Sequence, residues 1–258
     1  MDMRLITCIH GRLEITKAWF IHLDYLRATT GLRLPVTACY SDKADYYNVK
    51  AFLRSGDELV RHENKPLGAK FNFAAKCALE RKEDRFLIVG SDDFLSSDYI
   101  TEINKTNSNF AGVNQAIVYS PMHKKAVKWV HERPINKTIG SGRLLSRKAF
   151  DKGVKKFYKS DTKKGHMYEN QTYRLNNVRE IDGLELFEFW PNNINAGLDN
   201  ATEQLLANNK FKAKVLEHEQ PQMVCVKSFE NIHSFEEYDH MDAVEMDVVN
   251  DILKSVSF

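Results

Sequence analysis

The sequence predicts an α/β fold in which helices flank a mostly parallel central sheet. In the first 120 residues, short apolar runs alternate with segments of helical periodicity, which is the pattern of repeated strand–helix units. One of these runs, Arg85–Gly90, reads FLIVG after its first charged residue and predicts a strand that is covered on both faces. The 258 residues are 43% hydrophobic and 28% charged, which is typical of a folded globular protein.

The elements of the N-terminal half follow from the spacing of apolar residues. We expect strands at Arg4–Ile9, Leu34–Tyr40, Glu58–His62 and Arg85–Gly90, and helices at Glu14–Ala28, Ala44–Arg54 and Gly68–Arg81. The first helix should bury Ile15, Ala18, Trp19, His22, Leu23 and Leu26, and the third should bury Phe71, Ala74, Ala75 and Ala78. A strand precedes each helix, as a parallel sheet requires.

The pattern is less regular in the second half of the chain. We expect strands at Ala116–Tyr119, Arg143–Ser146, Leu184–Trp190 and Met223–Val226, a helix opened by proline at Pro121–His131, and a final helix at Met241–Leu253. The chain contains no repeat, low-complexity tract or linker. We therefore expect one domain over residues 1–258.

Charge and cysteine content exclude several classes of protein. The net charge is +2, from 37 basic and 35 acidic residues, so no field of the whole molecule indicates a nucleic acid or a membrane as the partner. The four cysteines form no CxxC pair and predict buried free thiols. No apolar run is long enough for a signal peptide or a spanning helix, so we expect a cytoplasmic protein.

The predicted strand Arg85–Gly90 leads directly into Ser91-Asp92-Asp93. Ligands of open parallel sheets bind beyond the carboxyl ends of the strands, and two adjacent carboxylates there favour a cation. A divalent ion held by carboxylate oxygens can bridge the two phosphates of a nucleotide-sugar and stabilise the leaving diphosphate. The alternative is that the two aspartates only cap the helix that begins near Ser97 or form a solvated turn.

Several motifs in a fixed order resemble family-2-type glycosyltransferases of the Rossmann-like GT-A fold. The segment Leu87–Asp93 is similar to the strand that ends in the Asp-x-Asp motif, and Asn64–Asn72 is similar to the segment that precedes it by roughly 20 residues in that family. Gly140–Arg147 resembles the acceptor-side segment, and Tyr168-Glu169-Asn170 resembles the acidic pair before a helix. The resemblance covers about residues 1–175.

The resemblance implies a non-processive enzyme that uses a nucleotide-sugar, with a UDP-sugar as the first candidate. Residues 1–120 would bind the donor, and residues 121–258 would bind the acceptor and end in a helix. The implied roles are contact with the nucleotide base and ribose for His10, Arg12 and Asp42, the base or diphosphate for Lys70, the donor ribose or sugar for Asp92, Mn²⁺ or Mg²⁺ binding for Asp93, and general base for Glu169.

Two positions depart from the family pattern. Ser91 replaces the first acid of Asp-x-Asp, and Asn170 leaves Glu169 as the only carboxylate of its pair. An inverting enzyme needs a general base that takes the proton of the acceptor hydroxyl, and Glu169 is the candidate. The alternative is that Glu169 is only an exposed acid in the first turn of a helix. His10, His62, His218 and His233 are candidate nitrogen ligands of the ion, and the resemblance favours His233.

Six lysines lie in the segment from Lys152 to Lys164, beside Phe157 and Tyr158. They predict either a solvated loop or a surface for a polyanionic acceptor such as a nucleic acid.

The sequence also bears on three other functions. Gln171–Leu175 lacks the tryptophan of processive sugar polymerases, and no membrane span accompanies it. A sugar-phosphate nucleotidyltransferase needs a glycine-rich loop after the first strand, whereas Ile9–Arg12 contains one glycine. A non-catalytic binding module on the same fold is the third, because of Ser91 and Asn170.

Overall fold

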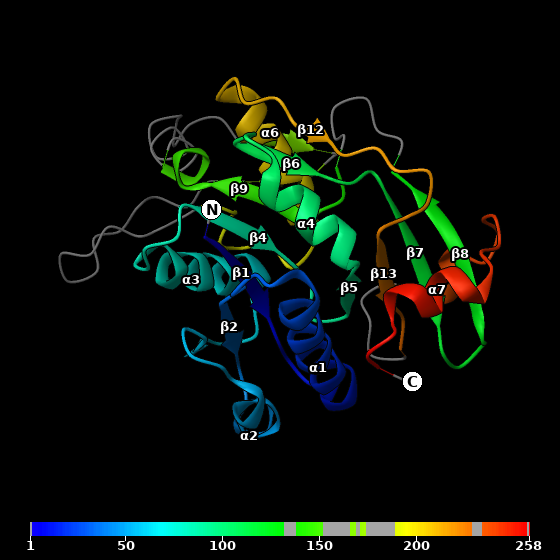
Figure 1. Cartoon of the computed structure of the whole chain (residues 1–258). Coiled ribbons are helices and arrows are strands. Elements are labelled where there is room, and N and C mark those ends of the chain that lie inside the picture. Colours follow the sequence, from blue (N-terminus) through cyan, green and yellow to red (C-terminus); the bar gives the residue numbers. More distant parts are fainter. Residues whose placement is uncertain are drawn as a thin grey trace.

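The computed structural model describes residues 2–131, 138–151, 166–168, 171–173, 189–228, 234–256 and 258. For residues 166–168 and 171–173, only the backbone is described. The main sheet has seven strands in the order β12-β6-β9-β4-β1-β2-β3 (Figure 1). Within it only β9 runs antiparallel to its neighbours, β4 and β6. The protein therefore has the predicted α/β fold with a mostly parallel sheet flanked by helices.

The elements of the N-terminal half lie where the sequence predicts them, within a few residues at each end. They are β1 (Met3–Cys8), α1 (Leu13–Thr30), β2 (Val36–Tyr40), α2 (Lys43–Val49), η1 (Lys50–Phe52), β3 (Glu58–Arg61), α3 (Leu67–Leu79) and β4 (Arg85–Ile88). Each strand from β1 to β4 pairs in parallel with its neighbour, so their carboxyl ends meet at one edge of the sheet.

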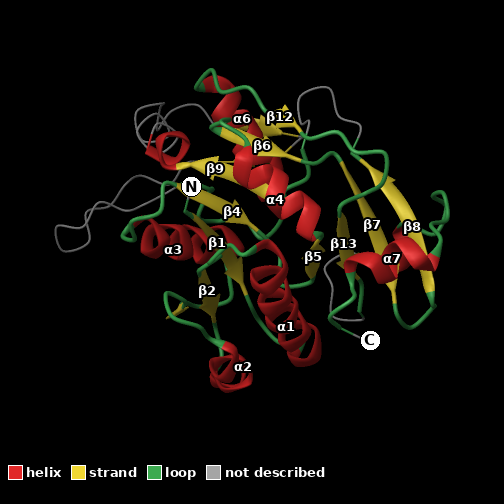
Figure 2. Cartoon of the chain, in the orientation of Figure 1, coloured by secondary structure: helices red, strands yellow, loops and turns green. Residues whose placement is uncertain are grey.

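Both faces of this sheet are covered. Successive side chains of a strand point to opposite faces, so Leu5 and Leu87 pack in the cluster that contains α1, whereas Ile6 and Phe86 pack in the cluster that contains α3. Figure 2 shows the helices α1 and α3 beside the strands of the main sheet. All six predicted core residues of α1 are buried. From α3, Ala74, Ala75 and Ala78 are buried, and Phe71 is partly buried against the same cluster.

A smaller sheet, built from strands of both halves of the chain, lies beside the first. The elements that follow β4 in the chain are β5 (Asp93–Leu95), α4 (Ser97–Lys105), β6 (Phe110–Gly112), β7 (Gln115–Ser120), β8 (Lys125–Val130), β9 (Arg143–Ser146), β10 (His166–Tyr168), β11 (Gln171–Tyr173), α6 (Leu198–Asn208), β12 (Lys214–Val215), β13 (Met223–Val226), η2 (Phe235–Glu237) and α7 (Met246–Ile252). The smaller sheet has the order β5-β13-β7-β8 and lies at the right of Figure 1 with α7. It brings a strand from near the C-terminus against the loop that follows β4.

The expectation of a helix at Pro121–His131 is wrong, because this segment contains the strand β8. Residues 121–124 form the turn between β7 and β8, and Lys124 adopts a left-handed φ of 49° there. The proline signal marks this turn rather than the start of a helix. Val127, Trp129 and Val130 are β-branched or aromatic and favour a strand once a neighbour is available for pairing.

The final helix is shorter than predicted. Before α7 begins at Met246, the chain pairs with β8: the Lys128 amide donates to the Asp242 carbonyl at 2.8 Å, and the Val244 amide donates to the Ala126 carbonyl at 2.9 Å. These hydrogen bonds hold residues 242–244 in an extended conformation.

The expected strand at Leu184–Trp190 falls mostly outside the described residues, which resume at Phe189. Phe189 and Trp190 form a bend rather than a strand. Both backbone amides donate to the Asn72 side-chain carbonyl at 2.9 Å, so α3 holds this segment.

All four cysteines are free, as predicted. Cys39 and Cys225 are buried, whereas Cys8 and Cys77 are half-buried. Within the described part of the chain, no helix combines the length and apolar character that crossing a membrane requires.

Candidate functional site

The loop after β4 forms a tight turn that presents Asp92 and Asp93 at the carboxyl edge of the main sheet. The Asp93 amide donates to the Gly90 carbonyl at 3.2 Å. A Cβ atom on Gly90 would lie 2.3 Å from Asp93 Oδ2, so a side chain at this position would displace the carboxylate. The sequence places the two acids at this edge correctly.

Arg12 joins the first loop of the sheet to this acidic turn. Its guanidinium forms an ion pair with Asp92, with 2.7 Å between Nη1 and Oδ2, and donates to Ser91 Oγ at 3.1 Å. The two side chains of the ion pair are only 17% and 16% exposed, so solvent screens the pair less than it screens a surface pair. Arg12 precedes α1 with a left-handed φ of 45°. The structure thus brings together two residues that the resemblance implied for the donor site.

Asp93 is partly buried and lies among hydrogen-bond donors from three separate parts of the chain. The Cys225 thiol and the Ser141 hydroxyl donate to its carboxylate, and Trp19 Nε1 donates to its carbonyl at 3.0 Å. Burial raises the pKa of Asp93, the charge of Asp92 raises it further, and the two donors and Lys227 only partly oppose this shift. The ionised carboxylate is therefore incompletely compensated, which favours a cation beside it.

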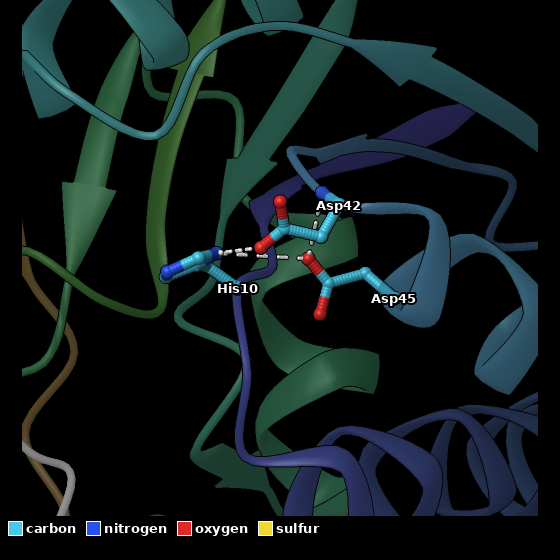
Figure 3. Close-up of side chains that lie close together, drawn as sticks. All are labelled: His10, Asp42 and Asp45. Carbon is cyan, nitrogen blue, oxygen red and sulfur yellow. Dashed lines mark hydrogen bonds and ion pairs between the residues drawn. The ribbon is translucent and has the colours of Figure 1, made fainter.

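A second acidic cluster lies at the same edge, after β1 and β2. His10 Nδ1 is 3.0 Å from Asp42 Oδ2 and 3.8 Å from Asp45 Oδ2 (Figure 3). One potential ligand atom from each of the three residues lies within 4.8 Å of the others, so an imidazole and two carboxylates could hold a metal ion here. The side chains of His10 and Asp42 are 44% and 62% exposed.

Asp45 already has a structural role in this second cluster. Its side chain is 1% exposed, and its two oxygens accept from the Gly11 amide at 2.9 Å and the Asp42 amide at 3.3 Å. These bonds tie the loop after β1 to the first turn of α2. An ion at this cluster would have to share the Asp45 oxygens with two backbone amides.

Lys70 lies beneath the first loop rather than free in the site. Its ammonium group donates to the Ile9 carbonyl at 2.7 Å and to Asn64 Oδ1 at 3.2 Å, and the residue is 1% exposed. Burial lowers its pKa despite nearby groups that raise it, first among them Cys8. Lys70 therefore fixes the loop that carries His10 and Arg12.

Several predicted residues lie outside the described ranges: Glu169, His233 and the lysines from Lys152 to Lys164. The helix expected after Glu169 is wrong, because Gln171–Tyr173 forms a strand, β11, antiparallel to β10. His62 Nδ1 lies 2.9 Å from the Glu63 carbonyl, and His218 Nε2 pairs with Glu102 at 3.1 Å. Of the histidines that the structure describes, His10 is the one that meets two carboxylates in a potential metal cluster.

Three residues near the acidic turn were not predicted. The sequence places Ser141 in the segment that resembles the acceptor side, predicts Cys225 as a buried free thiol, and gives no signal that singles out Lys227. Cys225 pairs with Asp93 across β13 and β5, and the Ser141 hydroxyl accepts from the Gly90 amide at 2.9 Å. One pattern in the sequence relates Cys225 to Lys227. Because residues two apart on a strand point to the same side, Cys225 and Lys227 lie on one side and Val226 on the other.

Comparison with known proteins identifies the fold. No family model and no curated protein matches the sequence. TarS from S. aureus matches with a TM-score of 0.52 and 12% identity over 88% of this chain and 60% of that one. The inositol-1-phosphate CTP transferase from T. maritima matches with a TM-score of 0.51 and 11% identity over 100% and 98%. A Drosophila β-1,4-galactosyltransferase 7 variant with manganese, UDP-Gal and xylobiose matches with a TM-score of 0.48 and 7% identity over 93% and 74%.

This chain therefore spans 60% of the TarS chain that it matches, and nearly all of the CTP transferase. TarS has the GT-A type of fold, and nucleotidyltransferases share the same Rossmann-like arrangement. At 12% and 11% identity, these matches show the fold alone and choose no reaction. With its sheet order and acidic edge, the chain has a GT-A-like fold.

Proposed function

We propose that the protein is a metal-assisted glycosyltransferase that moves a sugar from a nucleotide-sugar to an acceptor hydroxyl. The observation that carries this proposal is the acidic turn at the carboxyl edge of the sheet, where Asp93 is incompletely compensated and Asp92 is held by Arg12. Acids at this place suit a cation that binds a diphosphate. A UDP-sugar is the first candidate for the donor.

Asp93 is the residue that we propose as the main ligand of Mn²⁺ or Mg²⁺. Its carboxylate supplies the hard oxygen that both ions prefer, and its raised pKa reflects a negative charge that a cation would stabilise. The ion would neutralise charge on the leaving diphosphate. His233 remains the proposed nitrogen ligand by resemblance, and the cluster of His10, Asp42 and Asp45 is the alternative place for the ion.

In the proposed reaction, the acceptor oxygen forms a bond to the anomeric carbon while the bond from that carbon to the diphosphate oxygen breaks. The nucleoside diphosphate leaves with the electron pair, and the acceptor proton passes to a base. Glu169 is the proposed base of an inverting reaction. In the donor half, residues 1–120, the resemblance assigns His10 and Asp42 to the base and ribose.

The acceptor half is proposed to be residues 121–258. A glycan hydroxyl is the first candidate for the acceptor, and a base that takes its proton would make it a nucleophile. The nucleic-acid acceptor predicted from Lys152–Lys164 gains no support from the described residues. The cytoplasmic location stays a prediction from the sequence.

A sugar-phosphate nucleotidyltransferase is the second candidate, and two observations favour it. The CTP transferase from T. maritima matches this chain over 100% of its length. Arg12 also places a basic group directly after the first strand, at the start of an 18-residue helix whose N-terminus favours anions.

A thermal-shift screen of nucleotide-sugars with and without manganese tests the proposal, because a ligand that binds only the native state raises Tm. A glycosyltransferase should then slowly release nucleoside diphosphate and free sugar from the stabilising donor without an acceptor. A nucleotidyltransferase should instead release pyrophosphate from a nucleoside triphosphate and a sugar phosphate. If the protein binds the donor but releases neither product, it is the non-catalytic binding module.

Glu169→Gln tests the proposed base within the same assay. We expect lost transfer, measured in this assay as transfer of the sugar to water, with unchanged donor affinity, since the amide cannot accept the proton. Transfer at the wild-type rate would remove Glu169 from the mechanism.

A further inference from the structure

Lys227 extends from the small sheet toward the acidic turn. It follows β13 directly, and its amide donates to the Tyr119 carbonyl at 2.7 Å, which continues the parallel pairing of β13 with β7. Residues two apart on an extended chain point to the same side, so Lys227 shares the side of Cys225. Because the Cys225 thiol donates to Asp93, this is the side that faces the acidic turn.

The backbone fixes this approach. The Val226 amide donates to the Asp92 carbonyl at 2.8 Å, so the residue before Lys227 is hydrogen-bonded to the turn itself. The ring of Tyr238 lies 5.5 Å from Lys227 Nζ, close enough for a cation–π contact. Lys227 is half-buried between the turn and this ring.

The ammonium group of Lys227 stays charged in this setting. Burial lowers its pKa, but Cys225, Asp92 and Asp93 raise it more, so the net shift is upward. Arg12 is occupied by Asp92 and Ser91, whereas no carboxylate of a described residue lies within ion-pair distance of Lys227. Lys227 thus carries a positive charge close to Asp92 and Asp93, and it forms no ion pair with either of them.

We propose that Lys227, which follows β13 of the small sheet, binds the diphosphate of the donor nucleotide, while Arg12 approaches the acidic turn from the loop after β1. This inference rests on the proposed function, because it assumes that the turn binds a nucleotide. Lysine is a common point-charge ligand of phosphate oxygens. The small sheet would then take part in donor binding, and not only in the acceptor half.

The test compares the binding of UDP, UMP and uridine to the wild type and to Lys227→Met by calorimetry, with manganese and again with EDTA. In both conditions, we expect the variant to bind UDP roughly 10-fold to 100-fold more weakly, the range for a charge-assisted hydrogen bond. Uridine binding should not change. CDP and GDP replace UDP if another base is preferred.

Lys125→Met is the matched control, because Lys125 lies on β8 of the same sheet and pairs with Asp239 on the surface at 3.1 Å. It should bind UDP as the wild type does. Lys227→Arg should keep most of the affinity, since it keeps the charge.

The outcomes separate this inference from the proposed function. If the wild type binds none of the nucleoside diphosphates, the proposed function fails. If it binds UDP and Lys227→Met binds UDP equally well, only the role of Lys227 is wrong.

A measurement on the wild type covers the case in which the variant does not fold. Modification of lysines by an acylating reagent, followed by mass spectrometry, should show Lys227 protected by UDP but not by uridine, with Lys125 unprotected by either. Equal modification of Lys227 with and without UDP would overturn the inference.

Discussion

Two acidic clusters lie at the carboxyl edge of the main sheet, one after β2 and the other after β4. In the first, Asp42 is 62% exposed and His10 is 44% exposed, while Asp45 is bound to backbone amides. In the second, Asp93 is partly buried, its pKa is raised, and a strand from the far end of the chain contacts it. Close spacing of acids is common to both clusters, whereas burial and the kind of partner differ between them. On these two grounds we propose the second cluster as the ligand site.

The largest expected difference between the clusters comes from Asp93→Ala. If Asp93 is the main ligand of the ion, the affinity for UDP in the presence of manganese should fall by at least about 100-fold, since even outer-shell groups contribute 10-fold to 100-fold to metal affinity. Affinity in EDTA should change little. Calorimetry measures both, with Asp98→Ala, an exposed acid at the start of α4, as the control. Unchanged manganese-dependent binding would remove Asp93 from the site.

Arg12→Met should lower the free energy of unfolding by about 2 kcal/mol, because the change leaves a poorly solvated Asp92 without its charged hydrogen-bond partner. Urea denaturation measures this loss. Arg54→Met is the matched control: Arg54 pairs with Asp24 but is 55% exposed, so its loss should be below about 1 kcal/mol. Equal losses of unfolding free energy in the two variants would show that the ion pair with Asp92 stabilises the fold no more than an exposed ion pair does.

Asp42→Ala addresses the other cluster. If Asp42 contacts the ribose through a hydrogen bond, UDP affinity should fall by at most about tenfold, and equally with manganese and with EDTA. Calorimetry under the two conditions separates a ribose contact from a metal ligand. A loss that appears only with manganese would move the ion to His10, Asp42 and Asp45.

Asp93→Asn should stabilise the fold slightly at neutral pH. Because burial raises the pKa of Asp93, the folded protein holds this proton more tightly than the unfolded chain does. The protonated carboxyl therefore contributes its full stabilisation below the ordinary pKa of an aspartate, and this contribution is lost as the pH rises through the raised pKa. The uncharged amide removes this loss, and we expect a rise in Tm of roughly 2–4 °C at pH 7, or about 1 kcal/mol in a chain of this size. Thermal unfolding from pH 4 to pH 8 should show the gain shrinking in acid. A lower Tm at pH 7 would contradict the assignment.

The N-terminal half was predictable because its signals are local. Each strand and helix from β1 to β4 carries its own apolar pattern, and α1 buries the face that its spacing indicates. The small sheet was not predictable in the same way. β8 is a strand because it pairs with β7 and with residues 242–244, and no local pattern reports a partner so distant in the sequence.

The residues of the candidate site show the same difference between local and distant signals. Asp92 and Asp93 follow a strand that is evident from the sequence, and the family resemblance added Arg12. Cys225 reaches Asp93 from the strand β13, and Ser141 reaches it from the loop before β9; both strands lie where the sequence predicts them, but their register was unknown. A shift of one residue in β13 would turn Cys225 and Lys227 away from the turn, so only the structure could assign them.

The account depends most on which cluster holds the cation of the donor. Crystals grown with UDP and manganese would decide this through the anomalous signal of the metal. We expect one strong peak within about 2.3 Å of an Asp93 carboxylate oxygen, with the diphosphate on its other side. A peak among His10, Asp42 and Asp45, with none beside Asp93, would contradict the central claim.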